Sequence, residues 1–213
     1  HEELVKLLLT LKADVNAVDN NGMTPLLYAV MRDYVPSIKA LIENGADIEK
    51  VGAEGYLPLS VAIAEDKFEA AKTLMDAGAN INTPAGPDGL TPLMVAASQI
   101  APAEGAIFLP SSTRPINIAE GLIERGADIN AKSKSGLTAL MIAAANNNPP
   151  MIGLLIDAGA DVSAKNSQGK TAADVAQANG NAEAAQAIMV IGAAKSASGT
   201  PPKPADGQGS TSQ

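Results

Sequence analysis

The chain has 213 residues, with 15 Lys and Arg against 23 Asp and Glu and a formal net charge of −8. This acidic balance, without any run of basic residues, argues against a surface that binds DNA or RNA, because such surfaces cluster Lys and Arg against phosphates. The chain has no Cys, which excludes disulfides, thiol catalysis and Cys-ligated metal, and its longest apolar run, around Ala139 to Ala145, is too short to span a bilayer.

Apolar residues make up 46 % of the chain but aromatic residues only 2 %, and Ala is the commonest residue. Any core must therefore be built from small and aliphatic side chains, which suits closely packed helices. The absence of Cys does not fix the compartment, which stays open. The low charged fraction of 18 %, with the richness in Ala and Asn, leans toward a bacterial protein, exported or periplasmic.

Two short phrases recur along the chain at one spacing. The first phrase, typified by Gly-Ala-Asp-Ile-Asn, begins at Lys12, Gly45, Gly78, Gly126 and Gly159, and the steps between these starts are equal except for a longer one from Gly78 to Gly126. The second phrase, typified by Gly-Leu-Thr-Pro-Leu, keeps the same spacing and begins at Gly22, Gly55, Gly89, Gly136 and Gly169. Five copies at one period indicate an internal repeat.

Each phrase has a local structural meaning. Thr followed by Pro and an apolar run predicts a helix start, because the Thr hydroxyl accepts from a free amide of the first turn and Pro fits the first helical position. Gly after an aliphatic run, as after Leu41 and Ile42, predicts a helix end, and the polar segments between the phrases predict tight turns. One unit is therefore turn, helix, short link and helix.

A 33-residue unit of this kind, with Thr-Pro-Leu opening its first helix, resembles the ankyrin repeat. The resemblance implies an all-α fold, an ankyrin-repeat solenoid of turn-helix-link-helix units followed by a disordered C-terminal tail. The repeat domain is expected over residues 1–195 and comprises a partial first unit at 1–18, full units at 19–51, 52–84, 85–132 and 133–165, and a C-terminal capping unit at 166–195.

The N-terminal residues 1–9 resemble the second helix of a repeat, with no first helix before them. Leu4, Val5, Leu8 and Leu9 would then face water on one side, and a repeat that cannot bury its own face needs a neighbour. We therefore expect a further repeat or a cap upstream of this sequence.

The sequence departs from the family pattern in two ways, one shared by all the units and one confined to a single unit. The usual His after Thr-Pro-Leu is absent, and the hydrogen bonds it makes between loops must be lost or replaced at Leu27, Ser60, Met94, Met141 and Asp174. In the second full unit, Leu57 stands where Thr caps the other helices, at a cost of about 1 kcal/mol.

The longer step from Gly78 to Gly126 locates an insertion of 15 residues in the fourth unit. One inserted residue lies in the turn at 83–87, and the others form a loop expected over 98–117. This loop carries three Pro and the apolar triplet Ile107, Phe108 and Leu109. The triplet either folds back onto the array or contacts a partner, since long loops in compact arrays are often functional.

The last unit shows the signs of a cap. The residues Gly192, Ala193 and Ala194 have lost the turn-forming Asp, and the second helix is expected to carry a polar covering that includes Asn179 and Glu183. Residues 196–213 have almost no aliphatic content and are expected to be a disordered tail.

No group of residues supports catalysis. Residues 164–171 fit a loose form of the phosphate-binding loop, but the repeat assigns Gly169 to a turn and Thr171 to a helix cap. The Asp residues of the first phrase recur roughly 10 Å apart, the spacing of packed helices, which is too far to share one metal. His1 is the only His and stands at the chain end. We therefore expect no enzyme activity, no cofactor, no metal and no small-molecule substrate.

The family resemblance instead places a partner surface on the concave side. The residue after each turn Gly forms a stripe there, apolar except at its last member and expected to be exposed, which consists of Met23, Tyr56, Leu90, Leu137 and Lys170. The same face includes Met31, Ser98 and Asn146. Exposed apolar stripes mark interaction sites, although these side chains could instead pack sideways on neighbouring turns.

The sequence thus predicts a non-catalytic scaffold that binds a folded protein partner through the concave face and the inserted loop. Two alternatives stay open. The chain could be the regulatory or targeting arm of a larger protein whose active domain lies upstream, or an inhibitor or immunity-type binder of one enzyme. Nucleic acid is not expected as a partner, and no membrane span is expected.

Overall fold

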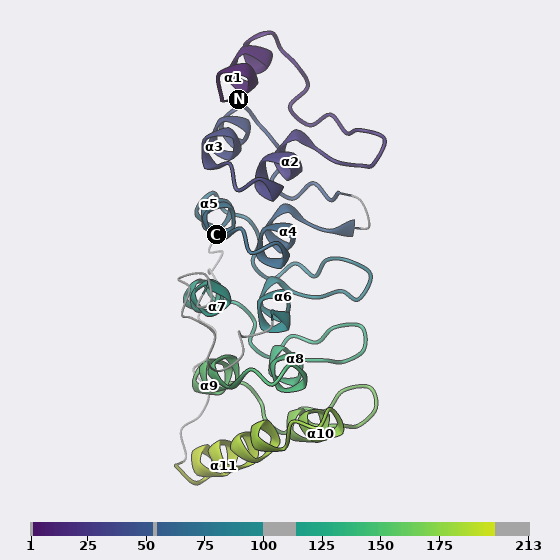
Figure 1. Ribbon diagram of the computed structural model, residues 1–213, viewed down its shortest axis with the longest axis vertical. Coiled ribbons are helices and arrows are strands. Elements are labelled where there is room, and N and C mark those ends of the chain that lie inside the picture. The colour runs from purple at the N-terminus through teal and green to yellow at the C-terminus, as the bar shows by residue number, and fades with distance from the viewer. Residues whose placement is uncertain (1, 53–54, 100–113, 199–213) are drawn as a thin grey trace, which may run out of the picture.

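The computed structural model describes residues 2–52, 55–99 and 114–198, which form eleven α-helices stacked in two layers (Figure 1). The inner layer consists of α2 (Pro25–Met31), α4 (Pro58–Ala64), α6 (Pro92–Ser98), α8 (Ala139–Ala145) and α10 (Ala172–Ala178). The outer layer consists of α1 (Glu2–Thr10), α3 (Val35–Glu43), α5 (Phe68–Asp76), α7 (Arg114–Glu124), α9 (Pro149–Asp157) and α11 (Ala182–Ser198). The expected all-α repeat solenoid is confirmed.

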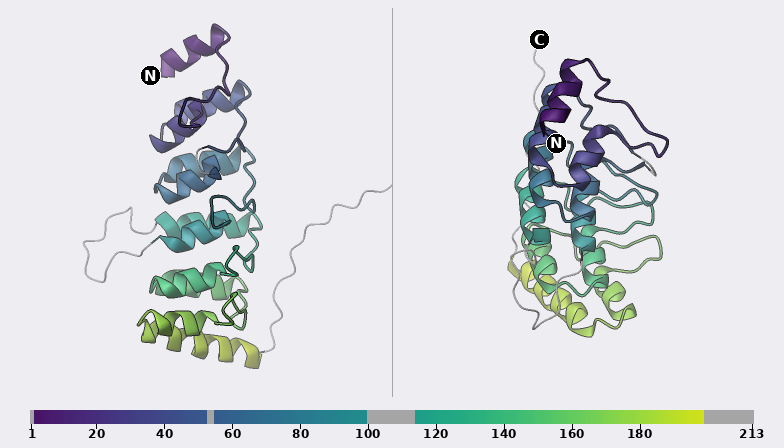
Figure 2. Two further views of the ribbon diagram at one scale, coloured as in Figure 1. Left: turned by 90° about the vertical axis from the view of Figure 1, so that its right-hand side faces the viewer. Right: turned by 45° about the horizontal axis from the view of Figure 1, so that its top comes forward.

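Turn segments between an outer helix and the next inner helix project from the inner layer, and we call them fingers (Figure 2). They contain the one β-bridge of the described residues, between Ala85 and Leu90. Successive inner helices lie side by side, as do successive outer helices. Fingers and inner helices together line the concave side of the stack.

Thr residues start four of the inner helices, as the sequence predicts. The hydroxyl oxygens of Thr24, Thr91, Thr138 and Thr171 each accept a hydrogen bond from an amide in the first turn, at 3.1 to 3.4 Å. Leu57 starts α4 without a side-chain cap, which confirms the expected loss. Its side chain is buried, so apolar burial offsets the missing cap hydrogen bond in part.

Small residues allow the inner helices to approach closely. Ala62, Ala96, Ala143 and Ala176 are fully buried, one in each of four successive inner helices. Because Ala adds only a methyl group beyond the backbone, its burial at these positions lets neighbouring helices approach closely. The core is continuous along the stack.

The positions of the missing family His have three kinds of environment. Leu27, Met94 and Met141 are buried and apolar, whereas the buried hydroxyl of Ser60 has no hydrogen-bond partner within the described residues. Asp174 is exposed and closes a capping box at the start of α10. Its Oδ2 accepts from the amide of Thr171 at 2.9 Å and from the Thr171 hydroxyl at 2.8 Å.

Asn side chains join one unit to the next. Asn130 donates from Nδ2 to the carbonyl oxygen of Gly159 at 3.3 Å, and its Oδ1 accepts from the amide of Asp161 at 2.8 Å. The same pair of hydrogen bonds is made by Asn16 and by Asn82. Glu49 occupies this position in the first full unit, where its Oε1 accepts from the amide of Asn80 at 2.8 Å. A carboxylate has no hydrogen to donate, so this junction has one of the two hydrogen bonds that the Asn junctions make.

Two expected boundaries are wrong at their edges. The range 98–117 expected for the loop is wrong at both ends, because Ser98 belongs to α6 and residues 114–117 form the first turn of α7, where Pro115 is tolerated. The tail expected from 196 is wrong over 196–198, because α11 continues through Ser198 over Ala-rich sequence of high helix propensity. Residues 199–213 lie outside the described residues.

The polar covering of the cap is also distributed differently from the expectation. Gln177 lies in α10, and Asn179 follows it as the C-cap residue of that inner helix. Helix α11 begins at Ala182, so Asn179 belongs to the concave side.

The junction pattern predicts opposite effects at two equivalent positions. Asn130→Ala removes both junction hydrogen bonds and should lower the free energy of unfolding by about 1–2 kcal/mol. Glu49→Asn adds a donor for the carbonyl of Gly78 and should raise it by about 0.5–1 kcal/mol. Urea unfolding followed by circular dichroism measures both changes. Asn80→Ala, which loses one hydrogen bond within its own turn, is the control. Equal effects of Asn130→Ala and Asn80→Ala would contradict the role of the junction.

The capping box predicts a pH-dependent contribution to stability. The hydrogen bonds from the backbone and then the side chain of Thr171 hold the pKa of Asp174 below its ordinary value of 3.8. A lowered pKa stabilises the fold above that ordinary value, and this contribution is lost as pH falls through the lowered pKa. Asp174→Asn should therefore flatten the dependence of the unfolding midpoint on pH between about 5 and 2. An unchanged dependence of the unfolding midpoint on pH in Asp174→Asn would contradict this prediction.

Candidate functional site

Each finger is closed by one backbone hydrogen bond to the stripe residue predicted from the sequence. The carbonyl oxygens of Met23, Tyr56, Leu137 and Lys170 accept from the amide four residues earlier, at 2.9 to 3.1 Å. In the fourth unit the bond runs from Ala85 to Leu90, five residues apart, at 2.9 Å. The finger of this unit is therefore one residue longer. The same bond fixes the stripe residue at the base of every finger.

Neighbouring fingers are also bonded to one another. The amide of Gly86 donates to the carbonyl of Gly55 at 3.0 Å, and the amide of Ser167 donates to that of Ser135 at 3.1 Å. Between them, the amide of Lys134 donates to the carbonyl of Asp88 at 3.1 Å. These bonds hold four fingers as one wall along the concave side.

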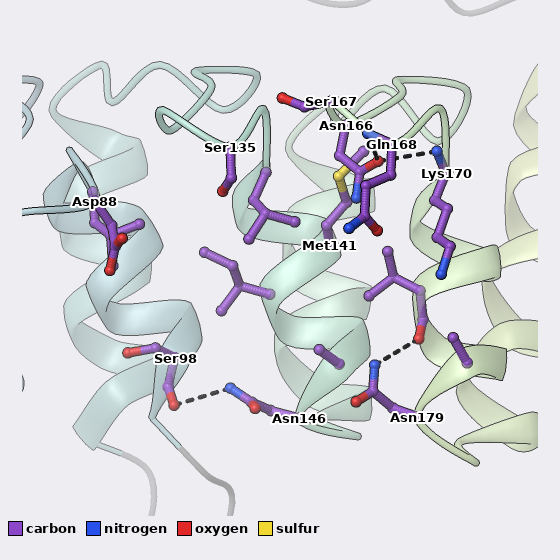
Figure 3. Close-up of a pocket in the computed structure, with 16 residues that line it drawn as sticks. Asp88, Ser98, Ser135, Met141, Asn146, Asn166, Ser167, Gln168, Lys170 and Asn179 are labelled. Atoms are coloured by element: carbon purple, nitrogen blue, oxygen red, sulfur yellow. Dashed lines mark hydrogen bonds between the residues drawn. The ribbon is translucent and has the colours of Figure 1, made fainter.

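The wall borders a groove with a volume of about 740 Å³ on the concave side of the last three units (Figure 3). The fingers lie on one side of it, and the C-terminal ends of α6, α8 and α10 on the other. Its apolar lining comes from Leu90, Leu137, Met141, Ile142, Ala145, Val175 and Ala178, and its polar lining from Asp88, Ser98, Ser135, Asn146, Asn166, Ser167, Gln168, Lys170 and Asn179.

The amide side chains of the groove are oriented by bonds to the protein. Asn146 donates from Nδ2 to the carbonyl of Ser98 at 3.0 Å, and Asn179 donates to that of Val175 at 2.8 Å. Their Oδ1 atoms make no hydrogen bond within the described residues. On the finger side, Oδ1 of Asn166 accepts from the amides of Gln168 and Lys170, which leaves its Nδ2 unused. The groove thus has acceptors along the helix ends and donors along the fingers.

Charge is confined to the two ends of the groove. Asp88 lies at one end and Lys170 at the other (Figure 3). Neither side chain has an ion-pair partner within the described residues. The groove is therefore neutral as a whole but polarised along its length.

The structure brings three of the five stripe residues together in this groove, namely Leu90, Leu137 and Lys170. The expected exposure of the apolar members is wrong in part. Leu90 and Leu137 are half-buried against the core, and Met23 is half-buried as well. Ser98 and Asn146 also line the groove, whereas Met31, 40 % exposed, lies two units away on α2.

Tyr56 packs sideways on the next finger. A β-carbon at Gly86 would lie 2.5 Å from Cε1 of Tyr56, so the ring rests where only Gly leaves room. The side chain keeps 37 % of its surface exposed. Ile107, Phe108 and Leu109, the other predicted contacts, lie outside the described residues.

Sequence reasoning missed several groove residues, above all Asn166, Gln168 and Asn179. The signal for Asn179 is that it stands one repeat period after Asn146, because each caps the C-terminal end of its inner helix. Asn166 and Gln168 have no such signal, because the repeat pattern predicts only a turn around Gly169. Their contribution to the groove depends on the stacking of neighbouring fingers.

A second groove, with a volume of about 730 Å³, lies at the N-terminal end between α1, α2 and α3. On its rim the hydroxyl of Tyr28 donates to Oδ2 of Asp19 at 2.7 Å. This bond is the main cause that holds the pKa of Asp19 below its ordinary value.

Within the described ranges, no cluster of three or more His, Asp or Glu side chains is suited to hold a metal ion. The same residues include no helix that is both long and apolar enough to cross a membrane.

The family model of ankyrin repeats, in three copies, matches residues 1–85 and 111–197. The match covers more than half of the chain, which therefore belongs to the ankyrin repeat family. Ankyrin repeats are generally protein–protein interaction modules. No curated protein matches the chain.

Two Gly residues with the same backbone conformation provide a matched test of finger stacking. Gly136 and Gly169 both have a φ of +75°, but a β-carbon at Gly136 would lie 2.8 Å from the amide nitrogen of Ser167, whereas none of the described atoms is within 4 Å at Gly169. Gly169→Ala should cost about 1 kcal/mol of unfolding free energy through backbone strain alone. Gly136→Ala should cost about 1–2 kcal/mol more, because the fingers must separate.

Thermal unfolding of both variants measures the difference. Hydrogen exchange at the Ser167 amide reports the separation of the two fingers, and it should quicken with Gly136→Ala only. Equal destabilisation and equal exchange in the two variants would show that the fingers do not depend on this close approach.

Proposed function

We propose that this chain is a non-catalytic binding module that recognises a protein partner through its concave face, centred on the groove of the last three units. The observation that carries the proposal is the set of oriented amide groups beside an apolar lining, with hydrogen-bonding capacity that the protein itself leaves unused. Concave sites that bind ligands combine these features.

Rigidity supports the same proposal. The fingers are bonded to one another and to the helices behind them, so the surface exists before a partner arrives. A preformed surface loses little conformational entropy on binding, which favours affinity. In this proposal Leu90, Leu137 and Lys170 contact the partner in the groove, and Tyr56, Met23 and Met31 extend the surface toward the N-terminus.

A bulky side chain placed in the groove tests the proposal. Ala178 is exposed on α10 and lines the groove, whereas Ala193 is exposed on the outer helix α11. Ala178→Trp should weaken binding of the partner about tenfold or more, because the indole occupies the groove. Ala193→Trp adds the same side chain outside the groove and should leave binding unchanged.

The partner is first captured from an extract of the source organism with the parent chain, identified by mass spectrometry and produced alone. Titration calorimetry then gives its Kd for the parent and the two variants. Circular dichroism confirms that each variant is folded. Equal Kd values for the parent and Ala178→Trp would refute the groove as the binding site.

A further inference from the structure

The two charges of the groove constrain what binds between them. The finger of Asp88 precedes α6 and that of Lys170 precedes α10, so two steps of the stack separate them. Packed helices lie roughly 8–10 Å apart, which sets the two side chains roughly 16–20 Å apart. An occupant that satisfies both must carry a positive group near Asp88 and a negative group near Lys170 at about this separation.

The walls between the charges constrain the occupant further. The Oδ1 atoms of Asn146 and Asn179 are acceptors on the helix side, whereas Nδ2 of Asn166 and the side-chain amide of Gln168 supply donors on the finger side. An extended polypeptide has amide donors and carbonyl acceptors along both edges, so it can meet both walls at once. Its side chains then reach the apolar lining at Leu137 and its neighbours.

We propose that the groove binds an extended peptide segment of the partner, with a Lys or Arg followed six residues later by an Asp or Glu and with apolar residues at the second and fourth positions between them. An extended chain advances about 3.3 Å per residue, so six residues span about 20 Å. Side chains two residues apart point to the same side, so the even spacing directs both charges and both apolar residues into the groove. This inference rests on the proposed function and specifies the chemistry of the partner at the same groove.

Other polymers fit these features less well. The chain carries a net charge of −8, which repels the phosphates of nucleic acid. The groove lining has no aromatic ring on which a base could stack. A helical segment satisfies its own backbone groups and would leave the amides of both walls unpaired.

A labelled peptide tests the inference directly. The probe is Gly-Lys-Ser-Leu-Ser-Leu-Ser-Glu-Gly with a fluorescent label, and its binding to the full chain is measured by fluorescence anisotropy. We expect saturable binding that Ala178→Trp abolishes and Ala193→Trp leaves unchanged. A second peptide with the charges five residues apart places them on opposite sides, and it should bind about fivefold more weakly.

Charge reversal provides the decisive comparison. A third peptide carries Lys in place of Glu, and Lys170→Glu is the matching change in the protein. The parent should prefer the Glu peptide by about fivefold, and Lys170→Glu should prefer the Lys peptide by a similar factor. Both preferences should decrease at high salt, because exposed charges are screened. Lys170 is exposed and its side chain makes no hydrogen bond or ion pair within the described residues. Its charge is one of the causes that lower the pKa of Asp174, so circular dichroism first checks that Lys170→Glu is folded.

Each failure has a distinct meaning. If the peptides show no preference for charge or spacing, or fail to bind while Ala178→Trp still weakens the intact partner, then the extended-segment inference is wrong and the proposed function stands. If Ala178→Trp leaves the Kd of the intact partner unchanged, the proposed function is wrong, and the inference that rests on it is wrong as well.

Discussion

The structure depends on one constraint: no unit of this chain can bury its apolar face without the next unit. Each inner helix has only seven residues, too few to be stable alone in water. Its stability comes from packing, and fully buried Ala residues such as Ala96 and Ala143 allow that packing to be close. Close and regular stacking therefore sets the distance from one finger to the next and from one helix end to the next. The groove is the space between the fingers and the helix ends.

Close stacking also explains which polar groups remain available to a partner. The side chains of Asn16, Asn82 and Asn130 each use a donor and an acceptor in the junctions between units, where they bond to the segments that follow the outer helices. Asn146 and Asn179 use only their Nδ2 donors, which bond to carbonyl oxygens near the ends of the inner helices. The difference follows from geometry, because the C-terminal end of a helix presents free carbonyl oxygens but no free amides. An Asn at a helix C-terminus therefore orients its own oxygen outward, and two of them on successive units form a row of acceptors.

Much of this architecture could be predicted from the sequence, and the limits have physical causes. The Thr caps, the positions of the helices and the longer finger at Leu90 follow from local chemistry and from the repeat period. The half-burial of Leu90 and Leu137 could not be predicted from the sequence, because it depends on packing between neighbouring fingers. The same holds for Tyr56, whose ring rests on Gly86 of the next unit. The stripe predicts part of the finger side of the groove, and Asn146 is predicted on the helix side. Asn166, Gln168 and Asn179 are not predicted, because their place in the groove depends on the stacking of neighbouring units. The family relation covers residues 1–85 and 111–197 and does not distinguish one face from another.

The two halves of the chain differ in ways that bear on where a partner binds. Fifteen of the 23 acidic residues lie within residues 1–104, whereas the groove lies over the last three units and carries one Asp and one Lys. The N-terminal half is therefore the part that would attract a basic partner from a distance, whereas the groove of the last three units would recognise it locally. Attraction by the acidic half changes the rate of encounter and falls with ionic strength. Recognition in the groove depends on hydrogen bonds and apolar contacts, which salt screens much less. A partner that used both would associate in a salt-dependent way and, once bound, dissociate at a rate set mainly by the groove.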